Sequence, residues 1–375
     1  MTFLDTLFHI IFKFVSPFLK QNTNGRKEVK KILIVRLAYI GDVALTIPIL
    51  KPLREKFPNS EISFLVGNAA KEVVTNNPNL NKIICYDAPW FYPQKKLKAV
   101  IEYIRFGKMI RREGFDMVID FRGDFRNILF ILVMSGAPHR VGYDITGGGY
   151  FLTKIVPYKE DKHKLDFHLD IVRALGANSE KGKIACFPSD HENDKVYHFL
   201  SHHKIEKDDL LVGIHPGSRL PLKNWETGKY SIIADTLIRE YDAKIIITGN
   251  SKEKNITNEI SNSMKYDAIN SCGLFNLREL SVLMGRFNLF ICSDSAPMHL
   301  ASGANTPIIA LFGPSEWRDT GPLSEKSIVQ KIDLDCRKWC DSRSCNNINY
   351  QYCLKAVQPS DVLLSCRKIL SDVYI

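Results

Sequence analysis

The fold is decided by the stretch KILIVRLAYIGD, residues 31–42. Its first half is a short apolar run of the kind that forms a buried strand in a parallel sheet. Gly41 and Asp42 then open a segment, 43–57, whose apolar residues recur at helical spacing. A strand followed at once by a helix is the beginning of a βαβ unit, so this stretch predicts an α/β fold.

The same alternation of strand and helix continues along the chain and then begins a second time. Further strands are predicted at 62–66, 82–86, 117–120, 211–215, 244–248, 289–292 and 307–312. Helices are predicted at 95–113, 190–203, 230–241, 255–264, 277–284, 297–304 and 360–374. We therefore predict two doubly wound, Rossmann-like domains, with these segments: an N-terminal helix and basic linker (1–30), a first domain (31–190), a second domain (205–358) and a C-terminal helix (359–375).

Composition and charge narrow the class of protein. Of the 375 residues, 45% are hydrophobic and 25% charged, which excludes a disordered chain, a collagen-like fibre and a disulfide miniprotein. Lys and Arg number 51 against 41 Asp and Glu, a net charge of +10. This surplus indicates an anionic partner: nucleic acid, an anionic membrane surface or a phosphorylated substrate. No zinc-finger or helix-turn-helix signature supports nucleic acid.

The N-terminus has the pattern of an amphipathic helix over residues 1–20. Apolar residues recur there at helical spacing, and Lys20, Arg26, Lys27, Lys30 and Lys31 follow. Such a helix lies on a membrane surface or packs on its own protein, and the neighbouring cations favour the membrane. No secretory signal or membrane-spanning run is evident, so we expect a cytoplasmic protein, peripheral on the inner face of the cytoplasmic membrane.

Four of the nine cysteines cluster late in the chain as C-x3-C-x4-C-x7-C: Cys336, Cys340, Cys345 and Cys353. The spacing lacks the paired C-x2-C knuckles of common zinc sites. Two interpretations stay open, a metal-binding or redox-labile cluster and reduced cysteines in a compact loop, and we favour the second.

Polar residues follow three of the predicted strands, where doubly wound folds bind ligands. The first loop carries Asp42; the second carries Ser218, Arg219 and Lys223; and the third carries Asp294 and Ser295. Glycine, serine and basic residues ahead of a helix suit a diphosphate. Simple helix caps and a solvated turn are the alternatives. Neither G-x-G-x-x-G nor G-x-x-x-x-G-K-[ST] is present at these loops.

Taken in order, four blocks resemble glycosyltransferase family 9, the ADP-heptose:lipopolysaccharide heptosyltransferases. They are KILIVRLAYIGDVALTIPIL, GIHPGSRLPLKNW, IIITGNSKEKN and NLFICSDSAPMHLASGANTPIIALFGPSEW. The resemblance runs from about residue 31 to 362. It implies a GT-B fold, with two Rossmann-like domains facing across a central cleft, the first binding the acceptor and the second the nucleotide sugar.

The resemblance also implies roles for single residues. Asp42 corresponds to the general base and Lys223 to the lysine on the donor diphosphate. The other residues implied in donor binding are Gly41, Ser218, Arg219, Thr248, Gly249, Glu253, Asp294, Ser295, Ala296, Met298, His299 and Gly313. Within this set Ser295-Ala296 stands where the family usually has Thr-Gly.

The resemblance thus implies an inverting enzyme that needs no metal or cofactor and transfers heptose from ADP-heptose to a lipopolysaccharide-type saccharide. Arg122, Arg126 and Arg140 are candidates for binding that anionic acceptor, and ordinary surface charge is the alternative. A GT-B transferase with a different nucleotide sugar is the first alternative function. A non-catalytic polyanion-binding protein or membrane scaffold is the second.

Overall fold

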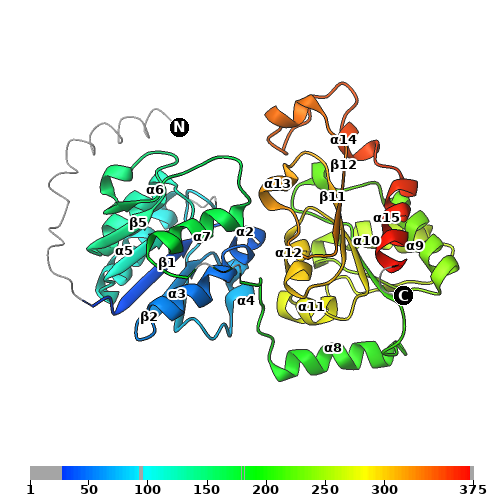
Figure 1. Ribbon diagram of the computed structural model, residues 1–375, viewed down its shortest axis with the longest axis horizontal. Helices are drawn as coiled ribbons and strands as arrows, with labels where there is room; N and C mark the ends of the chain where they lie inside the picture. The colour runs from blue at the N-terminus through cyan, green and yellow to red at the C-terminus, as the bar shows by residue number, and fades with distance from the viewer. Residues whose placement is uncertain (1–27, 93–95, 179, 181, 372–375) are drawn as a thin grey trace. The chain divides into compact units, whose positions relative to one another are not determined.

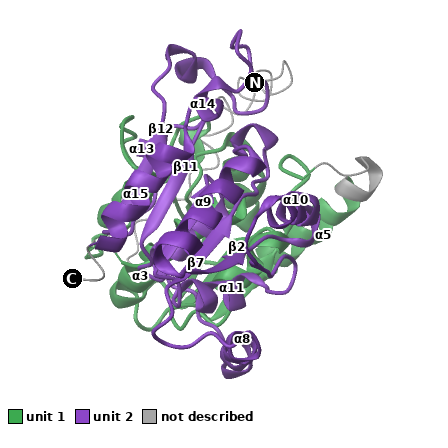
Figure 2. Cartoon of the chain, turned by 90° about the vertical axis from the view of Figure 1, so that its right-hand side faces the viewer, with its two compact units in different colours: residues 1–183 green, residues 184–375 purple. Residues whose placement is uncertain are grey.

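The computed structural model describes residues 28–92, 96–178, 180 and 182–371 of the chain (Figure 1). The predicted amphipathic helix over residues 1–20 lies outside the described residues. The chain divides into two compact units, residues 1–183 and 184–375, which Figure 2 shows in two colours. Each unit is a parallel sheet of six strands with helices around it, as the alternation of the sequence predicts.

The first unit has the strand order β3-β2-β1-β4-β5-β6, all strands being parallel. The strands are β1 (Lys31–Arg36), β2 (Glu61–Val66), β3 (Lys82–Cys85), β4 (Met117–Asp120), β5 (His139–Gly142) and β6 (Lys154–Ile155). The helices are α2 (Ile40–Ala44), α3 (Leu50–Lys56), α4 (Lys71–Val74), α5 (Lys96–Glu113), α6 (Phe125–Asn127) and α7 (Lys164–Ala174), with a π-turn over Ile128–Val133.

The second unit repeats this topology, with the order β12-β11-β10-β7-β8-β9. Its strands are β7 (Leu211–His215), β8 (Lys244–Ile247), β9 (Ile269–Asn270), β10 (Leu289–Ser293), β11 (Ile308–Phe312) and β12 (Ser327–Lys331). Its helices are α8 (Asp190–His202), α9 (Thr227–Tyr241), α10 (Lys254–Ser263), α11 (Leu277–Met284), α12 (Ala296–Gly303), α13 (Trp317–Thr320), α14 (Tyr352–Lys355) and α15 (Pro359–Ser371).

Each sheet is buried because helices pack on both of its faces. In the second unit α9 contacts α10 and α15 on one face, while α11 contacts α8 and α12 on the other. The central strands β1 and β7 are accordingly almost wholly buried, as apolar runs in a parallel sheet predict. The order of both sheets reverses between their first and fourth strands, β1 and β4 in one and β7 and β10 in the other. Doubly wound proteins bind their ligands at this switch point.

The single helix predicted over residues 43–57 is wrong. The segment is broken into α2, a 3-10 turn over Ile47–Ile49 and α3. Pro48 lies in that turn and has no N–H to donate to a preceding carbonyl, so an uninterrupted helix cannot pass through it.

The boundary between the units lies at residue 183, earlier than the predicted end of the first domain at residue 190. Helix α8, which follows, belongs to the second unit, because Arg278 of α11 forms an ion pair of 2.6 Å with Glu192 of α8. The predicted C-terminal helix corresponds to α15, and its apolar face joins the core of the second unit through Val362, Cys366 and Ile369. Among the described residues, no helix has the length and apolar character needed to span a membrane.

Candidate active site

In the first unit, Asp42 lies in the first turn of α2, directly after β1. Tyr39 occupies the N-cap position, so the alternative that Asp42 is the cap of this helix is wrong. The Oδ1 atom of Asp42 lies 3.1 Å from Nζ of Lys164 and 3.4 Å from Nη2 of Arg36. Its side chain is 24% exposed, which leaves it accessible to a substrate. Two cations therefore hold one accessible carboxylate.

Arg36 and Asp120 form the buried floor of this group. Arg36 is the last residue of β1 and donates to the carbonyl oxygen of Phe121. Asp120 is the last residue of the neighbouring strand β4, and it accepts hydrogen bonds from N of Gly123 (2.6 Å) and Nδ2 of Asn127 (3.1 Å). Burial raises the pKa of Asp120 to about 6. The sequence analysis missed both residues, although a charged residue that ends a buried strand is a recognisable signal.

Helix α7 completes the group and was also missed by the sequence analysis. Its first residue is Lys164, and one turn later His168 is buried against the ring of Phe121, with Nδ1 2.9 Å from the carbonyl oxygen of Leu45 at the end of α2. Burial lowers the pKa of His168 to about 3, and the nearby Arg36 charge adds to the effect. The neutral imidazole therefore donates Nδ1–H to that carbonyl.

The three candidate acceptor arginines of the first unit differ in their surroundings. Arg122 lies over the ring of Phe91, 4.6 Å from its centre, and donates to the carbonyl of Leu37, next to Arg36. Arg126 grips the carboxylate of Asp124 with Nε and Nη2, at 3.0 and 2.9 Å. Arg140 is buried and donates to the backbone carbonyls of Phe151 and Ala137. Its guanidinium is thus committed to the fold, and we no longer include it among acceptor residues.

In the second unit, the loop after β7 corresponds to the loop that carries Asp42. It closes in a 3-10 turn over Pro221–Lys223 and ends at Trp225, whose indole Nε1 donates to the carbonyls of Leu354 and Val357. Ser218 Oγ donates to the carbonyl of Leu220 and tightens the turn, whereas Arg219 is exposed.

Lys223 and Asp294, predicted from separate motifs, meet in this unit. Nζ of Lys223 lies 2.6 Å from Oδ2 of Asp294, and the two side chains are 19% and 7% exposed. Asp294 directly follows β10, so the pair lies at the switch point of the second sheet. Four other predicted residues, Ser295, Ala296, Met298 and His299, form the N-terminal cap and the first turn of α12.

The loop after β8 packs against the loop after β7 through a glycine. A Cβ on Gly217 would lie 2.2 Å from Oε1 of Glu253, so a larger residue there would have to displace the Glu253 side chain. Oγ1 of Thr248 lies 3.0 Å from Nδ1 of His215, and Gly249 follows Thr248 in the chain. Glu253 Oε2 accepts from the backbone N–H of Asn250. These contacts bring Thr248, Gly249 and Glu253 beside the Lys223 loop, and Gly217 is a residue that the sequence analysis did not single out.

The four clustered cysteines of the second unit surround one small cavity. The cavity has a volume of about 30 Å³, and Gly313 and Leu222 also line it. All four are free thiols. Within the described part of the chain, no three His, Cys, Asp or Glu side chains are arranged to hold a metal ion.

Taken together, the two topologically equivalent units and the polar loops at their switch points are those of a GT-B glycosyltransferase. Residues 103–350 match the family model described as glycosyltransferase family 9 (heptosyltransferase). The chain belongs to this family, which confirms the resemblance seen in the sequence, the class of enzyme and the two Rossmann-like domains.

Among curated proteins, the chain is similar to lipopolysaccharide heptosyltransferase 3 of Escherichia coli, with 24% identity over 89% of this chain and 97% of that protein. It is also 24% identical to lipopolysaccharide heptosyltransferase 1 of Campylobacter coli, over 91% of this chain and 99% of the relative.

Among solved structures, the chain resembles a family 9 glycosyltransferase from Veillonella parvula, with a TM-score of 0.78, 24% identity, and coverage of 92% of this chain and 99% of the other. It also resembles ADP-heptose lipopolysaccharide heptosyltransferase II of E. coli, with a TM-score of 0.73, 21% identity, and coverage of 92% and 100%. At this identity the two structures support the fold.

Proposed function

We propose that this chain is an inverting heptosyltransferase, which transfers heptose from ADP-heptose to a lipopolysaccharide-type saccharide. The observation that carries the proposal is the buried pair of Lys223 and Asp294 at the switch point of the second unit. An ammonium group there suits a diphosphate, and a carboxylate beside it suits sugar hydroxyls. The names of the two relatives, both lipopolysaccharide heptosyltransferases, support the same substrates.

In the proposed reaction, an acceptor hydroxyl attacks the anomeric carbon of the heptose. A new carbon–oxygen bond forms as the bond to the diphosphate breaks, with inversion at that carbon, and ADP leaves with the electron pair. Asp42 accepts the hydroxyl proton, a contribution of about 10²–10⁴-fold for a positioned general base. Arg36 and Lys164 orient its carboxylate before the reaction.

The departing diphosphate gains negative charge, which Lys223 and the backbone N–H groups at the start of α12 offset. We assign Asp294 to the heptose, and Thr248, Gly249 and Glu253 to the adenosine part of the donor. Of the first-unit arginines, Arg122 and Arg126 remain candidates for the acceptor. The first unit is then the acceptor domain and the second unit the donor domain.

The proposal is tested by a donor screen with purified protein. ADP-heptose and UDP-, GDP- and ADP-linked hexoses are offered with lipopolysaccharide core fragments, and products are identified by mass spectrometry. A heptose-sized mass increase that requires ADP-heptose supports the proposal. Transfer of a different sugar, with no transfer from ADP-heptose, would contradict it.

A different nucleotide sugar is the second candidate, and one observation favours it. Ala296 stands at the first position of α12, where the family usually has glycine. A methyl group at that place alters how closely a ligand approaches the backbone. Tight binding of UDP or GDP with weak binding of ADP would favour this candidate.

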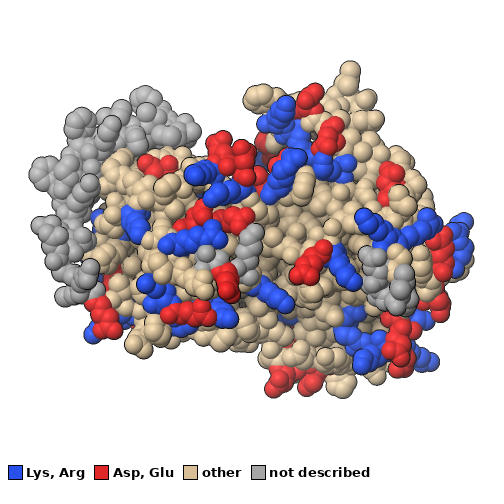
Figure 3. Space-filling view, in the orientation of Figure 1, with Lys and Arg blue, Asp and Glu red and all other residues tan. Residues whose placement is uncertain are grey.

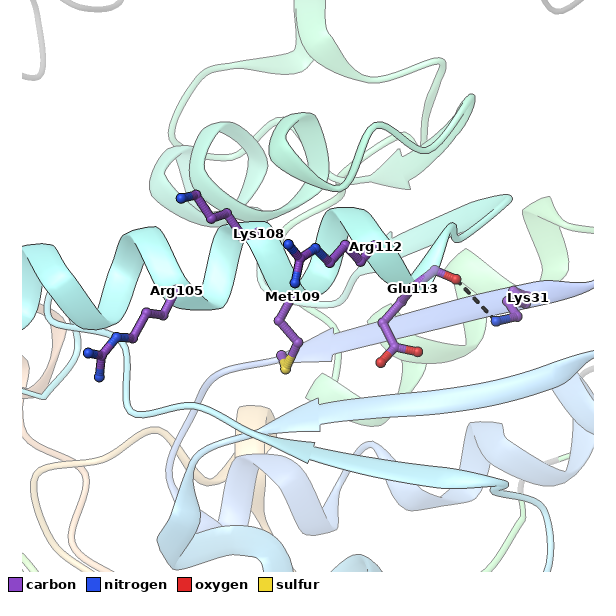
Figure 4. A pocket seen from close by; sticks show the side chains of 6 residues that line it. All are labelled: Lys31, Arg105, Lys108, Met109, Arg112 and Glu113. Carbon is purple, nitrogen blue, oxygen red and sulfur yellow. Dashed lines mark hydrogen bonds between the residues drawn. The ribbon is translucent and has the colours of Figure 1, made fainter.

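We also propose that the protein binds the membrane surface peripherally, on the cytoplasmic side. The predicted N-terminal helix lies outside the described residues, but α5 offers a second surface. Its exposed described residues are four apolar and four basic: Val100, Ile101, Ile104, Met109, Arg105, Lys108, Arg111 and Arg112. Figure 4 shows Arg105, Lys108 and Arg112 along this helix, beside Met109. Such a mixture suits anionic headgroups and the lipid beneath them.

Co-sedimentation with phosphatidylglycerol–phosphatidylcholine vesicles tests the role of α5. We expect Ile104→Glu to reduce binding, because a carboxylate opposes both the apolar and the anionic parts of the surface. Ile232→Glu is the matched control, since Ile232 is similarly exposed on α9 of the other unit. Equal binding by both variants would remove α5 from the membrane contact. In Figure 3, basic and acidic residues are interspersed on the visible face of each unit.

A further inference from the structure

The backbone on both sides of Lys223 is held by a single side chain from the cysteine-rich segment. The amide Nε2 of Gln351 lies 2.8 Å from the carbonyl oxygen of Asn224, 3.2 Å from that of Leu222 and 3.5 Å from that of Pro221. Leu222 and Asn224 are the residues immediately before and after Lys223, and Pro221 lies one residue further back. One amide group, about 130 residues further along the chain, thus fixes the turn from which the Lys223 side chain departs.

Gln351 is itself held in an unusual backbone conformation. Its φ is 59°, in the left-handed region that residues other than glycine seldom adopt. Its backbone N–H donates to Sγ of Cys345 at 3.2 Å, and helix α14 begins at the next residue. The glutamine therefore connects the thiol of Cys345 on one side with the Lys223 turn on the other.

The small cavity lined by the four cysteines is a second place where the cysteine-rich segment and the Lys223 turn meet. Its wall includes Leu222 from the Lys223 turn, Gly313 from the loop after β11 and Gln351 itself. A Cβ on Gly313 would lie 2.7 Å from Leu354 Cγ and 3.4 Å from Cys353 Sγ, so the cysteine segment packs tightly on this loop. At about 30 Å³ the cavity has room for a water molecule.

We propose that Gln351 is a positioning residue for Lys223, and that addition of a soft, thiol-alkylating electrophile to Cys336, Cys340, Cys345 or Cys353 weakens donor binding through it. The inference rests on the proposed function, in which Lys223 binds the donor diphosphate. A displacement of the turn moves the Lys223 ammonium away from both the diphosphate and Asp294, and small displacements of charged groups in a site have large effects. A chemical change at the thiols therefore reaches the donor.

The first experiment replaces Gln351 by methionine, which has similar length but donates no hydrogen bond. ADP affinity is measured by calorimetry, and kinetics are measured with the donor and the acceptor varied in turn. We expect ADP affinity to fall about tenfold and KM for the donor to rise, with KM for the acceptor unchanged. Gln351→Glu should weaken ADP binding further, because a carboxylate would face three carbonyl oxygens.

Gln358→Met is the matched control. The Gln358 amide also donates to two backbone carbonyls, those of Lys355 and Ala356, neither of which is a residue of the Lys223 turn. If Gln351 acts only on general stability, both variants lower the melting temperature and neither alters donor KM. That result, or a Gln351→Met protein with normal ADP affinity, would overturn the proposal.

The second experiment tests the coupling in both directions, from the donor site to the thiols and from the thiols to the donor site. The protein is treated with N-ethylmaleimide, whose double bond adds the thiolate sulfur and then takes up a proton, and labelled cysteines are identified by mass spectrometry. We expect ADP to slow labelling of the cluster severalfold, and labelling in turn to weaken ADP binding. Cys85, which is half-buried in the first unit, is the internal control.

The outcomes separate this inference from the proposed function. If the unmodified wild-type protein does not bind ADP but binds another nucleotide, the proposed donor is wrong, and the same experiments are repeated with that nucleotide. If ADP binds but neither the Gln351 substitutions nor labelling of the cluster alters its affinity, the positioning role is wrong and the proposed donor stands. Replacement of the four cysteines by serine should abolish the effect of N-ethylmaleimide on ADP binding.

Discussion

The two units share one topology but hold their central carboxylates in different ways. Asp42 in the first unit is 24% exposed and shares one oxygen between Lys164, which is 40% exposed, and Arg36. Asp294 in the second unit is 7% exposed and forms an ion pair of 2.6 Å with Lys223. A loosely held carboxylate can exchange a cation for a substrate, whereas a buried pair is set before any ligand arrives. The difference fits a proton acceptor in one unit and a fixed donor site in the other.

The largest effect on turnover is expected from replacing Asp42, the central carboxylate of the first unit. Asp42→Asn keeps the size of the side chain but removes the proton acceptor, so we expect turnover to fall by about 10²–10⁴-fold. ADP binding, which we assign to the other unit, should stay within about twofold of wild type. Single-turnover kinetics and calorimetry measure the two quantities. Turnover near the wild-type rate would remove Asp42 from the mechanism.

The next effect comes from breaking the buried pair of the second unit. Lys223→Met leaves the carboxylate of Asp294 buried without this cation, and we expect the free energy of unfolding to fall by about 3 kcal/mol. ADP affinity should fall by about 10–100-fold, because the diphosphate loses a charge-assisted contact. The double variant Lys223→Met/Asp294→Asn should recover much of the stability but not the ADP affinity. Thermal unfolding and calorimetry distinguish these outcomes, and unchanged ADP affinity would contradict the assignment.

A smaller effect is expected at the exposed partner of Asp42. Lys164→Met removes a pair whose two side chains are partly open to water, so stability should change by less than about 1 kcal/mol. Turnover should fall by about tenfold or less, since Arg36 still holds the carboxylate. Comparing the melting temperatures of Lys164→Met and Lys223→Met tests the contrast directly. A larger loss of stability in Lys164→Met would reverse it.

The smallest effect on activity at neutral pH, and the clearest on acid stability, is expected from His168. Since burial lowers its pKa to about 3, the native state stays unprotonated below pH 6.5 while the unfolded chain takes up a proton. His168 therefore does not reduce the free energy of unfolding above pH 6.5. As the pH falls from about 6.5 to 3, this group lowers that free energy by about 1.4 kcal/mol per pH unit.

Between pH 4 and 6 the buried carboxyl of Asp120 changes the free energy of unfolding in the opposite direction to His168. Its pKa is raised to about 6, so the native state keeps a proton there that the unfolded state has released, and its contribution falls as the pH rises. The effect of His168 is therefore measured by comparing the pH dependence of stability in a His168 variant with that of the wild type. Denaturant unfolding of His168→Gln should show a flatter loss of stability on acidification than wild type, and equal slopes would show that His168 is not buried in its neutral form.

The sequence alone predicted the alternating fold and many of the loops around the two switch points, because those depend on local patterns. Lys223 and Asp294 lie 71 residues apart, yet parallel strands bring their carboxyl ends to one edge, so their meeting followed from topology. Lys164 and His168 could not be predicted in this way. Their position depends on how α7 packs on α2 and the adjoining turn, which no local pattern encodes.

Arg140 shows that the solvent exposure of a charged residue could not be predicted from the sequence. Its charge and its place near the polar loops made it a candidate for the acceptor, but the structure buries it among the carbonyls of its own unit. A sequence shows that a residue is charged, whereas its solvent exposure depends on segments far along the chain. The same holds for Gln351, whose three carbonyl partners come from a loop that precedes it by well over a hundred residues.

The switch point also has a consequence for how the protein folds. In the first unit β1 pairs with β2, about 30 residues later, but also with β4, whose partner residues lie about 85 positions on. Contacts between such distant segments form slowly, because a long loop must close before they gain anything. During synthesis, the Asp42 group, which Arg36, Asp120 and Lys164 support, therefore cannot assemble until β4 and then α7 have left the ribosome, although β1 and β2 can pair earlier.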